Sequence, residues 1–168
     1  MGTHDFHYRV RWDQFEAAYS KHGGAVLNGD GPVFLEDVYA SRARWEKGAT
    51  AQLTRYCQFI SCSPSEDQER LRLFVKKFSP YFDEPPVATY RDPNGYGLAF
   101  PPDETETIKR LVNAISISKA LHDYERFLES DMNSSEVQPL IWMERYLAAI
   151  LEFWGGCLSN FGMVYTRF

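Results

Sequence analysis

The stretch PLIWMERYLAAILEFWGG, from Pro139 to Gly156, contains the clearest structural signal in the sequence. Proline suits the first position of a helix, and apolar residues then recur with helical spacing on one side. The two glycines at the end weaken or terminate a helix. The pattern predicts a long core helix with one apolar stripe. That stripe consists of Leu140, Met143, Leu147, Ile150, Leu151 and Trp154.

Two further helices are predicted immediately upstream. Asp103 and Glu106 have capping-box spacing, and apolar residues at helical intervals follow from 108 to 115. A second helix is expected to begin near Ser118 and to bury its apolar side. The buried side would contain Leu121, Tyr124 and Leu128.

Strands are predicted in three parts of the chain. Apolar and polar residues alternate from Phe6 to Trp12, which is typical of a half-buried strand. The segments 87–91 and 96–100 flank Asp92-Pro93-Asn94-Gly95, whose proline and glycine favour a hairpin turn. The segment from Met163 to Phe168 predicts a closing strand.

The first half of the chain contains two helix starts. Asp13 stands three residues before Glu16, which predicts a capping box and a short helix that ends at Gly23. The sequence Ser63-Pro64-Ser65-Glu66 predicts a second start, with Ser63 as cap, Pro64 in the first turn and Glu66 reaching back. Pro80 is expected to close this second helix.

Two other segments of this half give weaker signals. From Phe34 to Lys47 the apolar and aromatic residues lie near helical spacing, which predicts a helix. From Thr50 to Cys62 the apolar residues fit neither the helical nor the strand period, so residues 50–62 are open to either assignment.

The mixture of elements lacks a regular strand–helix–strand alternation and therefore predicts the α+β class, with a small antiparallel or mixed sheet that includes an 87–100 hairpin and a C-terminal strand. A length of 168 residues predicts a single compact domain, residues 1–168. The net charge of −5 argues against nucleic-acid binding. Without an apolar run near the roughly 20 residues of a membrane span, or a signal leader, we expect a soluble cytoplasmic protein.

Motifs for catalysis or metal binding are incomplete. Ser116 and Lys119 have the serine–lysine spacing of penicillin-recognising enzymes, but the companion motifs are absent and a helix cap is the better interpretation. His4 and His7 lack a third ligand nearby in the sequence. Cys57, Cys62 and Cys157 make an odd number that predicts no disulfide framework. We therefore expect no catalytic residues, no metal and no cofactor.

Negative charge is concentrated between Asp103 and Glu136, where 8 acidic and 4 basic residues lie. Glu125, Glu129 and Asp131 are expected at or near the C-terminal end of one helix, where carboxylates oppose the macrodipole. Charge in an unfavourable position is more easily understood if it serves recognition. The aromatic residues Tyr90 and Tyr96, beside the predicted hairpin turn, are candidate interface anchors because exposed aromatics are frequent hot spots. These five residues form the predicted partner-binding surface.

The order Tyr96-Gly97-Leu98-Ala99-Phe100-Pro101-Pro102-Asp103, followed by a helix with Ile108-Lys109-Arg110-Leu111-Val112, resembles YfbM-like proteins, a group of small bacterial proteins without assigned chemistry. The long helix that leads into the strand Gly162–Tyr165 extends the resemblance over about residues 94–168. Relatives of this kind occur beside toxin genes, so the resemblance implies an immunity role.

Two functional hypotheses follow. The first is a non-enzymatic protein-binding module, of the immunity or antitoxin type, that occludes a cognate toxin or effector with a basic active site. The alternative is a small-molecule enzyme or ligand-binding protein whose site is assembled only in the fold. A flat acidic surface favours the first, and a concave cluster of titratable groups favours the second. The sequence leaves the partner and the oligomeric state open.

Overall fold

Helices and strands follow one another irregularly along the chain, which confirms the α+β class. The computed structural model describes residues 4–28, 34–36, 38–60, 63–84, 86–92, 97–130 and 138–167. The chain divides into two compact units, each built from segments far apart in the sequence. The first unit comprises Met1–Lys47, Val87–Thr107 and Cys157–Phe168, and the second comprises Gly48–Pro86 and Ile108–Gly156.

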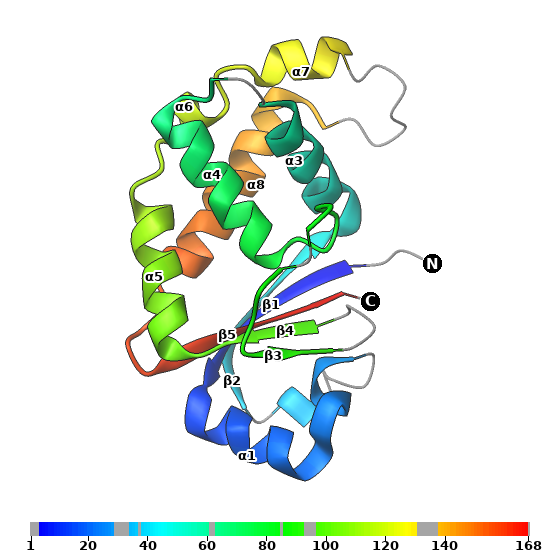
Figure 1. Cartoon of the computed structure of the whole chain (residues 1–168), viewed down its shortest axis with the longest axis vertical. Helices are drawn as coiled ribbons and strands as arrows, with labels where there is room; N and C mark the ends of the chain where they lie inside the picture. Colours follow the sequence, from blue (N-terminus) through cyan, green and yellow to red (C-terminus); the bar gives the residue numbers. More distant parts are fainter. Residues whose placement is uncertain are drawn as a thin grey trace. The chain divides into compact units, whose positions relative to one another are not determined.

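The first unit contains a five-stranded antiparallel sheet with the order β2-β1-β5-β4-β3 (Figure 1). The strands are β1 (His4–Arg11), β2 (Tyr39–Glu46), β3 (Tyr90–Arg91), β4 (Gly97–Phe100) and β5 (Phe161–Arg167). The predicted closing strand is confirmed as β5, which lies at the centre of the sheet. The predicted hairpin strands are confirmed over residues 90–91 as β3 and 97–100 as β4, which pair Tyr90 with Ala99, whereas residues 87–89 are not in a strand. Residues 93–96 of the predicted turn lie outside the described part of the chain.

The prediction of a helix over Phe34–Lys47 is wrong, because residues 39–46 form β2. Along β2, half-buried and exposed residues alternate strictly, which is the period of a strand. Seven residue pairs join β2 to β1. The aromatic and apolar residues of this segment fit both periods approximately, and pairing with β1 selects the strand.

One face of the sheet is covered by α1 (Trp12–His22) and the 3-10 helix η1 (Gly23–Leu27). Tyr8 and Val10 of β1 pack there against Phe15 of α1. The predicted strand 6–12 is confirmed as far as Arg11. The predicted short helix is also confirmed, as is its end at Gly23, whose positive φ of 63° suits glycine. The predicted capping box is wrong, because the helix begins before Asp13 and its cap residue, Arg11, makes no side-chain cap bond.

The second unit is helical, and α5 runs across the boundary between the units in the sequence. The helices are α3 (Lys47–Phe59), α4 (Glu66–Phe78), α5 (Pro102–Asn113), α6 (Ile117–Ala120), α7 (Tyr124–Ser130) and α8 (Leu140–Gly155). The long core helix predicted after Pro139 is confirmed as α8, and its stripe is buried except for the half-buried Leu140. Trp154 packs its ring against Phe74 and Phe78 of α4, with centroids 5.6 and 6.0 Å apart.

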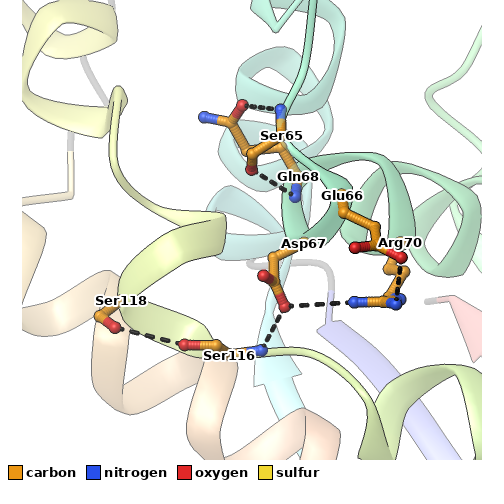
Figure 2. Close-up of polar contacts among 7 residues, drawn as sticks. All are labelled: Ser65, Glu66, Asp67, Gln68, Arg70, Ser116 and Ser118. Carbon is orange, nitrogen blue, oxygen red and sulfur yellow. Dashed lines mark hydrogen bonds and ion pairs between the residues drawn. The ribbon is translucent and has the colours of Figure 1, made fainter.

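Residues 50–59 of the segment that the sequence left open are helical, since α3 runs to Phe59, and residues 61 and 62 lie outside the described part of the chain. The helix start at 63–66 is confirmed, but its capping box lies two residues later than predicted (Figure 2). The Gln68 backbone N–H donates to Ser65 Oγ at 3.2 Å, and the Ser65 N–H donates to Gln68 Oε1 at 2.8 Å. The predicted end before Pro80 is confirmed, because α4 ends at Phe78 and Ser79 is its C-cap.

The starts of the two helices predicted upstream of Pro139 are displaced. The first helix is confirmed as α5, but it begins at Pro102, so the helix already includes Asp103, which was predicted to precede it. The predicted single helix from Ser118 consists of α6 and α7, separated by Leu121–Asp123. Because α7 restarts at Tyr124, Phe127 is buried while Leu128 is only half-buried.

Candidate functional site

The predicted partner-binding residues that the structure describes belong to different units. Glu125 and Glu129 are exposed on α7 of the second unit, whereas Tyr90 lies on β3 of the first unit. Tyr96 and Asp131 lie outside the described residues. Glu125 and Glu129 lie together on one helix, and we call them the α7 carboxylate pair.

The inner side of α7 holds the helix in place through aromatic and polar contacts. The buried Phe127 ring packs against Tyr56 and Phe59, with centroid separations of 5.5 and 5.6 Å. The Tyr124 hydroxyl accepts a hydrogen bond from Gln52 Nε2 at 2.6 Å and donates to the Gln138 carbonyl at 2.8 Å. Burial raises the pKa of Tyr124, so this phenol stays neutral and keeps its proton for the second bond. The exposed side of α7 is thus presented on an anchored helix.

The charges on α7 differ from the prediction in one respect. Glu125 lies in the first turn, where a carboxylate complements the helix macrodipole, so the expectation that it opposes the dipole is wrong. Glu129 lies in the last turn, as predicted, where its charge is unfavourable. The nearby cation Arg126 contacts Phe59 and Asp123. Its guanidinium lies 5.7 Å from the Phe59 ring centroid and 3.8 Å from the Asp123 carboxylate.

Tyr90 is half-buried in an aromatic cluster of the first unit. Its ring centroid lies 4.4 Å from that of Tyr19 and 5.8 Å from those of Trp12 and Phe15. These contacts stabilise the first unit, and only part of the ring remains at the surface. A role for Tyr90 as an interface anchor stays a prediction.

A pocket of about 390 Å³ lies within the second unit. This volume is at the small end of the range for ligand sites. The pocket is formed by α3, α4 and the segment that follows α4. Its lining residues are Cys57, Gln58, Arg72, Lys76, Phe82, Asp83 and Glu84.

Three of the charged residues of this pocket have polar partners. Lys76 forms an ion pair with Glu84, and this hydrogen-bonded ammonium lowers the pKa of the Glu84 carboxyl. Arg72 donates to the Ile60 carbonyl at 3.3 Å. Burial raises the pKa of the Cys57 thiol, so the sulfur is held as the poorly nucleophilic neutral thiol. The arrangement suits reversible binding better than nucleophilic chemistry.

Ser116 and Ser118, from the segment with serine–lysine spacing, lie at the start of α6 in the second unit (Figure 2). Ser116 occupies the N-cap position of α6, as predicted, but without a side-chain cap bond. Its backbone N–H donates to Asp67 Oδ1 at 2.8 Å, and its hydroxyl lies 3.3 Å from that of Ser118. Asp67 also lies 3.7 Å from Arg70. These contacts link α4 to the start of α6.

His4 and His7 lie three residues apart on β1 and therefore on opposite faces of the sheet. Arg44 Nη2 donates to His4 Nε2 at 2.6 Å, whereas His7 is fully buried. Within the described ranges, no group of three or more His, Cys, Asp and Glu residues is placed to hold a metal ion. No helix in the same ranges is long and apolar enough to cross a membrane.

Sequence reasoning missed one surface, the outer edge of β2. Arg42 and Arg44 are exposed there on the same face of the sheet, since they pair with Tyr8 and Phe6 of β1. The sequence contains a signal for a strand here, because the small residues Ser41 and Ala43 alternate with Arg42 and Arg44. The prediction of a helix over this segment concealed it.

Comparison of the chain with protein-family models, curated proteins and solved structures finds no match. The resemblance to YfbM-like proteins stays a prediction from the sequence.

Proposed function

We propose that this protein is a non-enzymatic protein-binding module that covers a basic surface of its partner, in the manner of a cytoplasmic immunity protein that occludes a toxin. The α7 carboxylate pair carries the proposal. Glu125 and Glu129 are one turn apart, so they project from the same side of the helix. Tyr124 and Phe127 on the other side are buried, which keeps the position of the two charges fixed.

The repulsion between the two carboxylates supports a role for the pair in recognition. Like charges at this spacing destabilise a helix by a few tenths of a kcal/mol. Neither carboxylate has an ion-pair partner among the described residues, so both are available to a cationic surface. Exposed charges of this kind accelerate association with a complementary partner and add specificity.

The product of the gene adjacent to this one is the appropriate first probe. We expect it to bind the wild-type protein, and we expect Glu125→Lys/Glu129→Lys to slow association about tenfold at low ionic strength. The difference should shrink as salt is added, because screening weakens exposed charge interactions. The matched control is Glu16→Lys/Glu144→Lys, which reverses two exposed charges on other helices.

Stopped-flow or biosensor kinetics at several salt concentrations provide the measurement, and urea unfolding verifies that each variant is folded. Equal association rates for the wild type and the α7 variant would exclude this pair as the binding surface. Failure of the neighbouring product to bind the wild type would count against the immunity role.

Binding of a small organic ligand is a second candidate, favoured by the pocket of about 390 Å³ beside Arg72 and Lys76. A thermal-shift screen with small organic anions tests it. A stabilising compound should lose its effect in Arg72→Ala and keep it in Arg70→Ala, which removes a neighbouring arginine outside the pocket lining. A panel without any stabilising compound would count against this candidate.

A further inference from the structure

The outer edge of β2 is unpaired among the described strands. In an antiparallel sheet, successive residues direct their backbone N–H and C=O groups to alternate sides. Half of the backbone groups of β2 therefore point away from β1. β2 ends the sheet order, and no other described strand pairs with that side (Figure 1). Such an edge can accept a further strand from another chain.

β2 carries charged side chains, which is one usual protection of an edge, but it lacks the others. Natural edge strands are commonly very short, interrupted by proline or bent by bulges. The opposite edge follows this rule, since β3 has only 2 residues, whereas β2 has 8 and contains no proline. The register with β1 has one irregularity, between Arg9 and Val10, and residues 41–46 pair regularly beyond it. β2 therefore presents a regularly paired segment over residues 41–46.

The outer face of this edge carries Arg42, Arg44 and Glu46, and the two arginines are held in position. The Arg42 guanidinium lies 5.8 Å from the Phe6 ring centroid and 5.6 Å from that of Tyr39. Arg44 is hydrogen-bonded to His4 at 2.6 Å. Side chains that are already ordered lose less conformational entropy when a partner binds. The two cations are thus presented on one face of the strand.

Charge decides which kind of strand fits. Opposite charges that face each other across neighbouring strands stabilise a sheet, and like charges destabilise it. A second copy of this chain would pair its β2 symmetrically, and the two registers with the longest overlap place Arg42 opposite its own copy or opposite Arg44. A strand with carboxylates at alternate positions would instead face both arginines favourably, with one like-charge contact if it extends as far as Glu46.

We infer that β2 binds an extended segment of another protein that carries aspartate or glutamate at every second position, and that this segment becomes a sixth strand of the sheet. Backbone hydrogen bonds supply affinity, and Arg42 and Arg44 supply selectivity. This surface belongs to the first unit and does not depend on the α7 carboxylate pair.

The probe is a capped eight-residue peptide in which glutamate alternates with valine, compared with its lysine counterpart. Added to the ¹⁵N-labelled full chain, the glutamate peptide should shift the amide signals of β2 and β1 and slow amide exchange at alternate residues of 39–46. We expect the lysine peptide to bind about tenfold more weakly. Arg42→Glu/Arg44→Glu should reverse this preference. Lys77→Glu/Lys119→Glu, which reverses two exposed charges of the second unit, should leave it unchanged.

Two further peptides test backbone pairing. In one, the backbone nitrogens of the odd-numbered residues are methylated, and in the other, those of the even-numbered residues. Strand addition requires the N–H groups of one set to face β2, so one peptide should bind and the other should not. Equal binding by both methylated peptides would contradict the inference. So would the absence of β2 shifts, or a dimer of the wild-type chain that Arg42→Glu/Arg44→Glu dissolves.

Discussion

Protonation of His7 should make this protein sensitive to mild acid. The side chain lies on β1 of the first unit and is 0% exposed. Its ring centroid lies 4.8 Å from that of Trp45 and 5.1 Å from that of Tyr165. A charged imidazolium would lose its hydration in this environment. Burial therefore lowers the pKa of His7 from its ordinary 6.5 to about 3.

The size of the effect follows from linkage between protonation and folding. Because the folded state keeps His7 neutral, its stabilising contribution is complete above pH 6.5 and is lost as the pH falls from 6.5 towards 3. At pH 5 the protonated form of the His7 imidazole outnumbers the neutral form by about 30 to 1 in the unfolded chain. In the folded chain the imidazole is neutral at this pH. This ratio corresponds to about 2 kcal/mol of stability lost between pH 7.5 and pH 5.

Urea unfolding of wild type, His7→Gln and His122→Gln at pH 7.5 and pH 5 measures this loss. The glutamine at position 7 retains a polar side chain but cannot gain a proton in this range. We expect the decrease in unfolding free energy to be about 2 kcal/mol smaller in His7→Gln than in the wild type. His122, which is exposed, is the matched control and should behave as the wild type does.

Equal decreases in the wild type and in His7→Gln would refute the reasoning. That result would mean that a group such as the buried Asp5, on the same face of β1, offsets the desolvation of the imidazolium. An NMR titration of the wild type gives a second reading that does not require the variant to fold. The His7 ring signals should stay unshifted down to about pH 4.

Three further predictions concern the packing of the folded chain. Leu147→Ala should lower the unfolding free energy by about 2–5 kcal/mol because the side chain is fully buried, whereas Ile141→Ala, at a side chain that is 62% exposed on the same helix, should cost far less; urea midpoints measure both. Gly97→Ala should destabilise strongly, since a Cβ there would overlap the backbone of η1, whereas Gly24→Ala meets nothing within 4 Å; thermal unfolding compares them. The Cys57 thiol should react with a disulfide reagent only after unfolding, because it is buried and burial raises its pKa; rapid labelling of the folded protein would contradict this.

Local sequence determined the elements whose signals have one interpretation. The stripe of α8 contains apolar residues at helical spacing between a proline and two glycines, and no strand could bury them on one side. The apolar run of β5 and the proline–glycine turn signal between β3 and β4 were equally clear. These signals depend on residues close in the sequence, so they could be interpreted without knowledge of the partners.

Tertiary contacts decided the segments whose residues suit two structures. Residues 39–46 are a strand because β1 offers them a backbone to pair with, and that pairing places Arg42 and Arg44 at the sheet edge. The break before Tyr124 moved Glu125 from the end of a predicted helix to the start of α7. The pocket beside Cys57 exists only because α3 and α4 meet. In each case the deciding free energy comes from burial against, and pairing with, residues distant in the sequence. The spacing of apolar residues within one segment carries no information about these partners.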